Sequence, residues 1–161
     1  MVFLNLMVSA ELENITNLCP ADPERFTYYF KIKCSSCGEV SEKETSVTKN
    51  EKVDIPNSRG EANLVQKCKM CERFGTITIV DKVGGGVLET GQAALFAQFE
   101  CRGIEPVDWA PKDGFVAEGL TGKKFEEVDL EEGEWADYDD KANESVCITE
   151  ISSEFIVGKN K

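Results

Sequence analysis

Two matched stretches, Cys34-Ser35-Ser36-Cys37 and Cys68-Lys69-Met70-Cys71, decide how this chain is organised. Each C-x2-C turn places two thiolates on one side of the backbone, so two turns supply a tetrahedral zinc shell with Zn–S distances of about 2.3 Å. The spacer between the pairs, residues 38–67, is longer than the roughly 15–20 residues usual in zinc ribbons. We therefore expect a ribbon-like site with an extra hairpin or loop within residues 39–62, where residues 56–60 are rich in turn formers.

Other chemistries use the same thiols. A rubredoxin-like iron centre has the same four ligands, and a redox C-x-x-C needs a βαβ setting with a helix N-terminus that lowers a thiol pKa. Zinc is the preferred interpretation, because both motifs lie among strand-like runs. Gly38 allows a positive φ, so that backbone N–H groups point at sulfur. Basic residues beside the knuckles offset the charge of four thiolates: Lys33, Lys67, Lys69 and Arg73.

The four-cysteine shell limits what the metal can do. A catalytic zinc keeps an open position for water or substrate, whereas a shell of four thiolates is closed. The chain contains no histidine, which excludes Ser-His and Cys-His nucleophiles. The sequence therefore predicts one structural Zn2+ and no enzymatic activity.

Composition narrows the class of protein further. The chain has 161 residues and a formal net charge of −12, and residues 117–154 carry most of the acidic excess. This charge argues against a nucleic-acid binder, and no run of residues approaches the roughly 20 apolar positions of a membrane span. Seven cysteines, four of them in metal spacing, indicate a reducing compartment, so we expect a cytoplasmic or nuclear protein.

Strand-like runs recur along the chain, at residues 2–8, 26–33, 64–67, 76–80, 95–100 and 146–157, the last with a possible break at Ser152-Ser153. In the first run Val2, Leu4, Leu6 and Val8 share one parity, which favours a strand over a signal peptide. Only residues 91–98 and 139–144 allow short helical turns. We predict an all-β fold.

Three consecutive glycines, Gly84 to Gly86, divide the chain near its middle. We place a boundary there, between an N-terminal β half (1–82) with the zinc site and a C-terminal β half (83–161) with the acidic segment, in what we expect to be one compact unit. Each half delivers an apolar strand into a cysteine followed by a glycine turn, which is consistent with a degenerate duplication.

The second half holds a candidate ligand or partner site in which a guanidinium, two carboxylates and an indole lie close in sequence: Arg102, Glu105, Asp108 and Trp109. A groove could use Arg102 to bind an anion and Trp109 to stack. The alternative is an internal ion pair at a turn with Trp109 in the core. The acidic run at residues 131–140 is interpreted as a solvated loop or as a docking segment for a basic partner.

Five motifs in order give the chain a family resemblance: Glu13-Asn14-Ile15-Thr16-Asn17-Leu18; Lys33-Cys34 with Cys37-Gly38-Glu39; Val65-Gln66-Lys67-Cys68-Lys69 with Cys71; Phe99-Glu100-Cys101-Arg102-Gly103 with Glu105-Pro106-Val107-Asp108; and Trp135-Ala136-Asp137-Tyr138-Asp139. The sequence is similar to the eukaryotic CXXC-motif-containing zinc-binding protein family. That resemblance implies two quasi-symmetric barrel-like β halves with a cavity between them, one structural zinc on Cys34, Cys37, Cys68 and Cys71, and no established enzymatic activity.

The leading hypothesis is a non-enzymatic, monomeric zinc protein that serves as a scaffold for protein partners, with no nucleic-acid or membrane partner. One alternative is a small-ligand binder or enzyme that uses a cavity between the halves. A further alternative is a protein that transfers metal. No role is predicted for the three cysteines outside the pairs, Cys19, Cys101 and Cys147.

Overall fold

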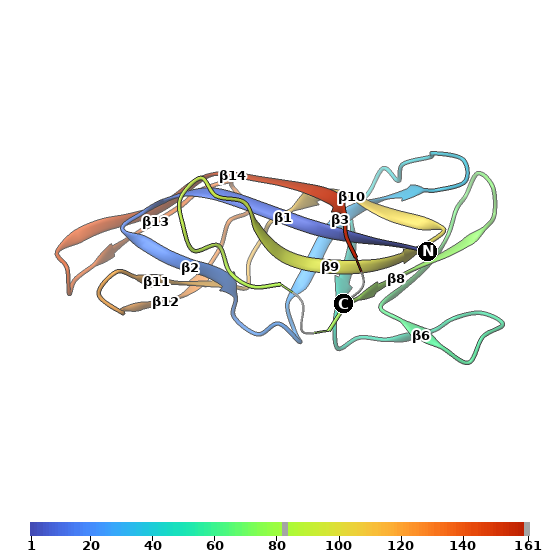
Figure 1. Ribbon diagram of the computed structural model, residues 1–161, viewed down its shortest axis with the longest axis horizontal. Helices are drawn as coiled ribbons and strands as arrows, with labels where there is room; N and C mark the ends of the chain where they lie inside the picture. The colour runs from blue at the N-terminus through green and yellow to red at the C-terminus, as the bar shows by residue number, and fades with distance from the viewer. Residues whose placement is uncertain (82–83, 160–161) are drawn as a thin grey trace.

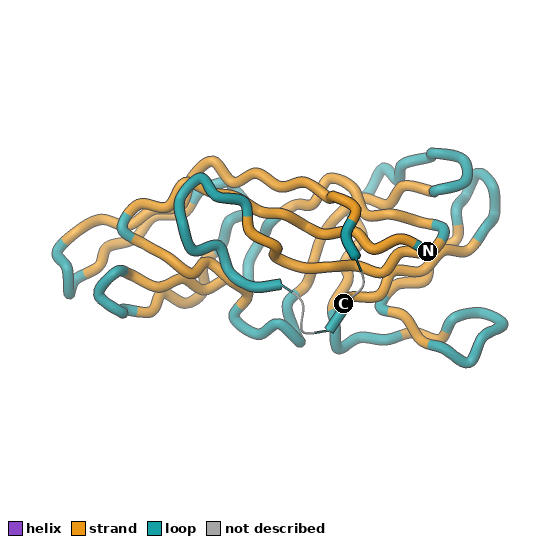
Figure 2. Tube along the Cα trace, in the orientation of Figure 1, coloured by secondary structure: helices purple, strands orange, loops and turns teal. Residues whose placement is uncertain are grey.

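The computed structural model describes residues 1–81 and 84–159, and fourteen β-strands account for the regular structure of that part of the chain. The described residues contain no helix, so none is present that could span a membrane. The strands are β1 (Val2–Glu13), β2 (Ile15–Pro20), β3 (Thr27–Cys34), β4 (Thr45–Thr48), β5 (Val53–Asp54), β6 (Glu61–Ala62), β7 (Leu64–Lys67), β8 (Phe74–Ile79), β9 (Ala94–Arg102), β10 (Ile104–Ala110), β11 (Phe115–Gly119), β12 (Lys124–Val128), β13 (Trp135–Asp139) and β14 (Glu144–Val157). The all-β prediction is confirmed (Figure 2).

A six-stranded antiparallel sheet with the order β13-β14-β1-β9-β8-β7 runs the length of the molecule (Figure 1). Two three-stranded sheets, β10-β3-β4 and β12-β11-β2, lie toward opposite ends of it, and β5 and β6 form a separate hairpin. β1 and β14 are long enough to serve both ends, since they contain 12 and 14 residues. The long sheet therefore joins the two ends of the molecule.

Buried and less buried residues alternate along β1, as expected of a strand with one face on the core. Leu4, Leu6, Val8 and Ala10 alternate with less buried residues and are themselves buried. β1 pairs with β14 on one side and with β9 on the other. The predicted apolar parity thus faces the core, and this interpretation of the N-terminal run is confirmed.

Aromatic rings fill the space between the long sheet and the smaller ones. Phe99 is fully buried and meets the rings of Tyr28 and Phe30 edge to face, with centroids 5.3 and 5.5 Å apart. Phe96 and Phe115 continue the same cluster toward the other end, with ring centroids 5.9 Å apart. The edge-to-face pairs of Phe99 add about 0.5–1.5 kcal/mol each beyond the area they bury. One continuous core therefore unites the two ends.

Some local predictions were wrong. The strand predicted at residues 95–100 is confirmed as part of β9, but the short helical turn allowed at residues 91–98 does not form, and Glu144 begins β14 instead of ending a helical turn. The expected break at Ser152-Ser153 is absent, and the irregularity falls at Glu150, which has a φ of 50° at the register shift against β1. Pairing with neighbouring strands decides the structure of these segments, because their local composition is ambiguous.

The sequence boundary between residues 82 and 83 lies outside the described residues. On either side of it, strands from both parts of the chain pair with one another. β1 and β9 are adjacent in the long sheet, and β3 is adjacent to β10 in one of the smaller sheets. β2, from the first part of the chain, pairs with β11 from the second.

Candidate metal centre

The first knuckle begins where β3 ends, at Cys34. The Gly38 N–H donates to the Cys34 carbonyl at 2.8 Å, and the Cys34 N–H donates to the Glu39 carbonyl at 2.9 Å. Gly38 has a φ of 79°, in the left-handed region that glycine occupies without strain. The positive φ predicted for Gly38 is confirmed.

The second knuckle repeats this geometry immediately after β7. The Glu72 N–H donates to the Cys68 carbonyl at 2.9 Å, and the Cys68 N–H donates to the Arg73 carbonyl at 2.9 Å. Glu72 takes the place of Gly38 and has a φ of 61°. A glutamate in this conformation is strained by roughly 1–2 kcal/mol, because its Cβ crowds the following carbonyl. The second knuckle keeps the fold of the first without its glycine.

The four thiols of the two knuckles converge. The Sγ atoms of Cys34 and Cys71 are 3.5 Å apart, those of Cys37 and Cys68 are 3.6 Å apart, and all four lie within 4.8 Å of one another. A zinc tetrahedron with Zn–S distances of about 2.3 Å has sulfurs about 3.8 Å apart. The donor set and its spacing therefore fit a tetrahedral zinc ion.

Backbone donors favour the thiolate at the first cysteine of each motif. The N–H of Cys37 is the largest influence on Cys34 and helps to lower its pKa to about 6. The N–H of Cys71 likewise lowers the pKa of Cys68. At Cys37 the N–H of Glu39 acts in the same direction, but the adjoining Cys68 thiol, burial and Cys34 outweigh it and raise the pKa to about 11. The cluster is thus arranged to hold negative charge, which a cation would stabilise.

The two knuckles come from different sheets. Cys34 ends a strand of the β10-β3-β4 sheet, whereas Cys68 follows the edge strand β7 of the long sheet. Few polar contacts join the knuckles apart from the sulfurs; one is a 3.4 Å hydrogen bond from the Arg73 guanidinium to the Ser36 hydroxyl. A metal bound by both motifs would therefore join two sheets at the end of the molecule.

The long spacer forms the predicted excursion. It contains β4 and the β5–β6 hairpin, in which Val53 pairs with Ala62 and Asp54 with Glu61. Residues 56–60 form the connecting turn, where Asn57 has a φ of 59°. The excursion leaves the sulfurs of the two knuckles in contact, so its length does not disturb the site.

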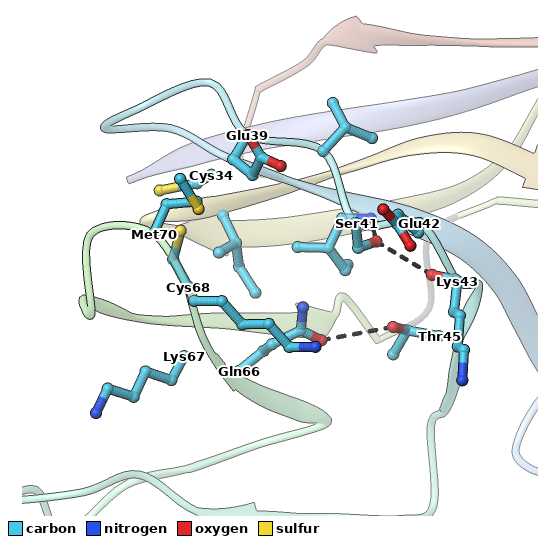
Figure 3. A pocket seen from close by; sticks show the side chains of 14 residues that line it. Cys34, Glu39, Ser41, Glu42, Lys43, Thr45, Gln66, Lys67, Cys68 and Met70 are labelled. Carbon is cyan, nitrogen blue, oxygen red and sulfur yellow. Dashed lines mark hydrogen bonds between the residues drawn. The ribbon is translucent and has the colours of Figure 1, made fainter.

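A groove opens beside the sulfurs, with a volume of about 510 Å³ (Figure 3). Its floor includes the buried side chains of Ile32 and Ile104, together with Cys34 and Cys68. Residues 39–43 and Thr45 form one wall, and residues 66–70 form the other. The sequence analysis did not find this groove, because its walls are 20 or more positions apart in the chain and local patterns do not show that they meet.

The structure does not gather the second candidate site into one pocket. Arg102 is exposed at the end of β9 and pairs with Glu100 at 3.5 Å, and within the described part of the chain it forms no ion pair with Glu105 or Asp108. Glu105 lies opposite Lys33 in the β10–β3 register. Asp108 is exposed with a φ of 51°.

Trp109, the fourth residue of that candidate site, lies in the core. Its side chain is buried, and its ring lies 5.7 Å from that of Phe96 and 6.3 Å from that of Phe115, between centroids. The indole therefore contributes to packing, as the alternative interpretation of this stretch expected. None of the four residues lines the groove beside the sulfurs.

The remaining three cysteines are free thiols away from the cluster. Cys101 is buried in β9, and burial raises its pKa to about 12. Cys147 donates a hydrogen bond to the Glu13 carboxylate at 3.2 Å, and that contact raises its pKa. Cys19 is partly buried, which also raises its pKa. These shifts keep the three sulfurs in the thiol form.

The fold and the site together define a class: an all-β protein whose two cysteine knuckles, one after a strand of each of two sheets, bring four sulfurs together as a candidate metal site. A family model described as CXXC motif containing zinc binding protein, eukaryotic, matches residues 5–156. The chain belongs to this family.

Relatives and solved structures agree with that assignment. A Caenorhabditis elegans protein, UPF0587 protein F46B6.12, is 45% identical over 158 residues, which cover 96% of this chain and 95% of the relative. The human CXXC motif containing zinc binding protein is 42% identical over 154 residues, covering 94% and 96% of the two chains. The crystal structure of C1orf123 superposes with a TM-score of 0.90 at 41% identity, covering 97% of this chain and 99% of that one. A hypothetical protein from Plasmodium falciparum gives a TM-score of 0.85 at 31% identity, covering 97% and 100%.

Proposed function

We propose that this protein is a non-enzymatic β scaffold whose interaction end is held together by one structural zinc ion. The observation that carries the proposal is the convergence of four sulfurs within 4.8 Å, two on each of two knuckles that follow strands of different sheets. Zinc on Cys34, Cys37, Cys68 and Cys71 would make that convergence stable. Structural zinc contributes roughly 10–16 kcal/mol of apparent binding free energy in zinc-finger peptides, and binding free energy of this kind is folding free energy.

Several features support a structural role over a catalytic one. Four protein sulfurs complete a zinc shell and leave no position for a substrate or an activated water. The chain has no histidine to act as a general base near the metal. The first cysteine of each motif is buried and its sulfur accepts backbone N–H groups, an arrangement that fixes the ligand in place.

The proposal extends to the setting in which the protein works. Free thiols suit a reducing compartment, so we place the protein in the cytoplasm or the nucleus as a monomer. The net charge of −12 favours protein partners over nucleic acids, whose phosphates would repel it.

The test compares Cys34→Ser with Cys147→Ser. Both variants replace one thiol, but only the first removes a proposed zinc ligand. We expect the Cys34→Ser protein to be purified with far less zinc and to lose cooperative melting at the knuckle end, while Cys147→Ser keeps its zinc and its melting curve. Native-like melting of a zinc-free Cys34→Ser protein would refute the proposal.

A second function, transfer of zinc to an acceptor, is favoured by one observation. Cys37 is exposed, so one face of the sulfur cluster is open to an incoming ligand. If the protein donates its metal, a weak competing chelator should remove zinc within minutes under native conditions. Retention of zinc for hours would count against transfer and leave the structural role standing.

A further inference from the structure

The groove beside the sulfur cluster lies between the edges of two sheets. β4 is the last strand of the β10-β3-β4 sheet, and β7 is the last strand of the long sheet. Asn63, just before β7, ties the two edges together by donating from its amide to the carbonyls of Thr48 at 3.2 Å and Lys49 at 2.9 Å. From that junction the two chain segments diverge toward the knuckles, and the groove occupies the space between them (Figure 3).

The groove has an apolar floor and polar walls. Ile32 and Ile104 are 3% and 2% exposed and form the floor. Met70, which is 69% exposed, and Val40, which is 40% exposed, add apolar surface at the rim. The volume of about 510 Å³ lies within the roughly 300–1,000 Å³ typical of ligand sites. The floor suits an apolar side chain, and the polar walls suit the backbone and charges around it.

Charges of both signs line the groove. The Glu39 carboxylate lies beside Cys34 and that of Glu42 lies beside Lys43, whereas the ammonium groups of Lys43 and Lys67 point away from Cys34, on the side of Thr45 and Gln66 (Figure 3). Lys69 is a third lysine in the lining. No ion pair with a carboxylate involves any of these three lysines within residues 1–81 and 84–159. The Lys67 ammonium lies over the Phe74 ring, 5.9 Å from its centroid, a contact that leaves its charge unneutralised. A partner could therefore offer carboxylates to these lysines.

We propose that this groove binds an extended acidic segment of a partner protein, with an apolar side chain on Ile32 and Ile104 and carboxylates at Lys43 and Lys67. An extended chain is the natural occupant because strand edges present unpaired backbone groups, and peptides commonly add to such edges. Acidic side chains suit these lysines, whose charges no carboxylate neutralises within the described residues, in an otherwise acidic protein. This inference rests on the proposed scaffold function and assigns that function a surface and a ligand chemistry.

The experiment selects peptides from a displayed random library on the zinc-loaded chain and measures their affinity for two double variants. The test variant is Lys43→Glu with Lys67→Glu. The matched control is Lys124→Glu with Lys141→Glu, two exposed lysines outside the groove. We expect the selected peptides to be rich in Asp and Glu around an apolar residue, to bind the test variant about tenfold more weakly or worse, and to bind the control unchanged.

A second measurement uses the unmodified chain, in case charge reversal beside the knuckle disturbs zinc. Adding a selected peptide to methyl-labelled protein should shift the NMR signals of Ile32 and Ile104 and leave those of Ile148, which is not a groove residue, in place. The inference is overturned if no peptide is selected, if the peptides lack acidic residues, if the test variant binds them as well as the control, or if the floor methyls do not shift. Zinc content and melting temperature are measured separately from peptide binding. A groove that binds no peptide therefore leaves the zinc proposal intact, whereas the zinc proposal is refuted only by native-like melting of zinc-free Cys34→Ser protein.

Discussion

Replacing Glu72 with glycine should stabilise the protein, although it deletes a side chain. Glu72 has a φ of 61° at the position that Gly38 occupies, with a φ of 79°, in the matching knuckle. An L-residue in this conformation costs about 1–2 kcal/mol, and glycine removes that strain. Glycine also loses more conformational freedom on folding, which destabilises the variant by roughly 0.5–1 kcal/mol and offsets part of that gain. The net expectation is a gain of about 0.5–1 kcal/mol.

Urea unfolding of the zinc-loaded protein measures this gain as a higher midpoint with an unchanged slope. In a melting experiment the shift should be about 1–4 °C, since 1 kcal/mol moves the midpoint by roughly 2–4 °C for a domain of this size. The matched control is Glu39→Gly, which makes the same chemical change next to Gly38, at a residue whose φ is not positive. The control should lose stability. The reasoning is refuted if Glu72→Gly is destabilised as much as Glu39→Gly.

Three further changes test the packing and the turns. Phe99→Ala should lower the free energy of unfolding in urea by about 3–5 kcal/mol, because the ring is fully buried. Phe74→Ala, at a residue that is 57% exposed, should stay within about 0.5 kcal/mol of the parent, and equal losses in the two variants would contradict the core we describe. Gly84→Ala should lower the melting temperature more than Gly122→Ala, because a Cβ at Gly84 would lie 2.3 Å from the Phe96 carbonyl oxygen whereas one at Gly122 has no atom within 4 Å. The reverse order would contradict the close approach of the Gly84 backbone to Phe96. Asp139→Ala should have a lower melting temperature than Asp139→Asn, because asparagine keeps an oxygen that accepts hydrogen bonds from the N–H groups of Lys141 and Ala142. Equal melting temperatures would contradict a stabilising role for these hydrogen bonds.

Most of the metal centre could be predicted from the sequence, because C-x2-C spacing fixes local geometry. Two sulfurs three positions apart lie on one side of a tight turn, and the Cys34 and Cys68 knuckles show the same pair of backbone hydrogen bonds. The positive φ of Gly38 was also predictable, since glycine is the residue that tolerates it. Glu72 was not, because nothing local marks a glutamate for the left-handed region.

The strands of the second half were harder to predict. β12 and β13 lack a run of apolar residues, and the acidic run that contains β13 was interpreted as a solvated loop or as a docking segment for a basic partner. Each becomes a strand by pairing with a neighbour, β12 with β11 and β13 with β14. The groove escaped prediction for a related reason. It lies between two sheet edges that Asn63 joins by hydrogen bonds, and a contact between separate segments leaves no periodic signal in the sequence.

The central claim is that zinc joins two sheets at one end of the protein. Hydrogen–deuterium exchange of the intact chain, with zinc bound and after chelation, tests it most directly. We predict that removing zinc speeds amide exchange in both knuckles, in β3 and in β7, and leaves β13 and the paired part of β14 protected. Unchanged protection in β3 and β7 after complete removal of the metal would contradict the claim.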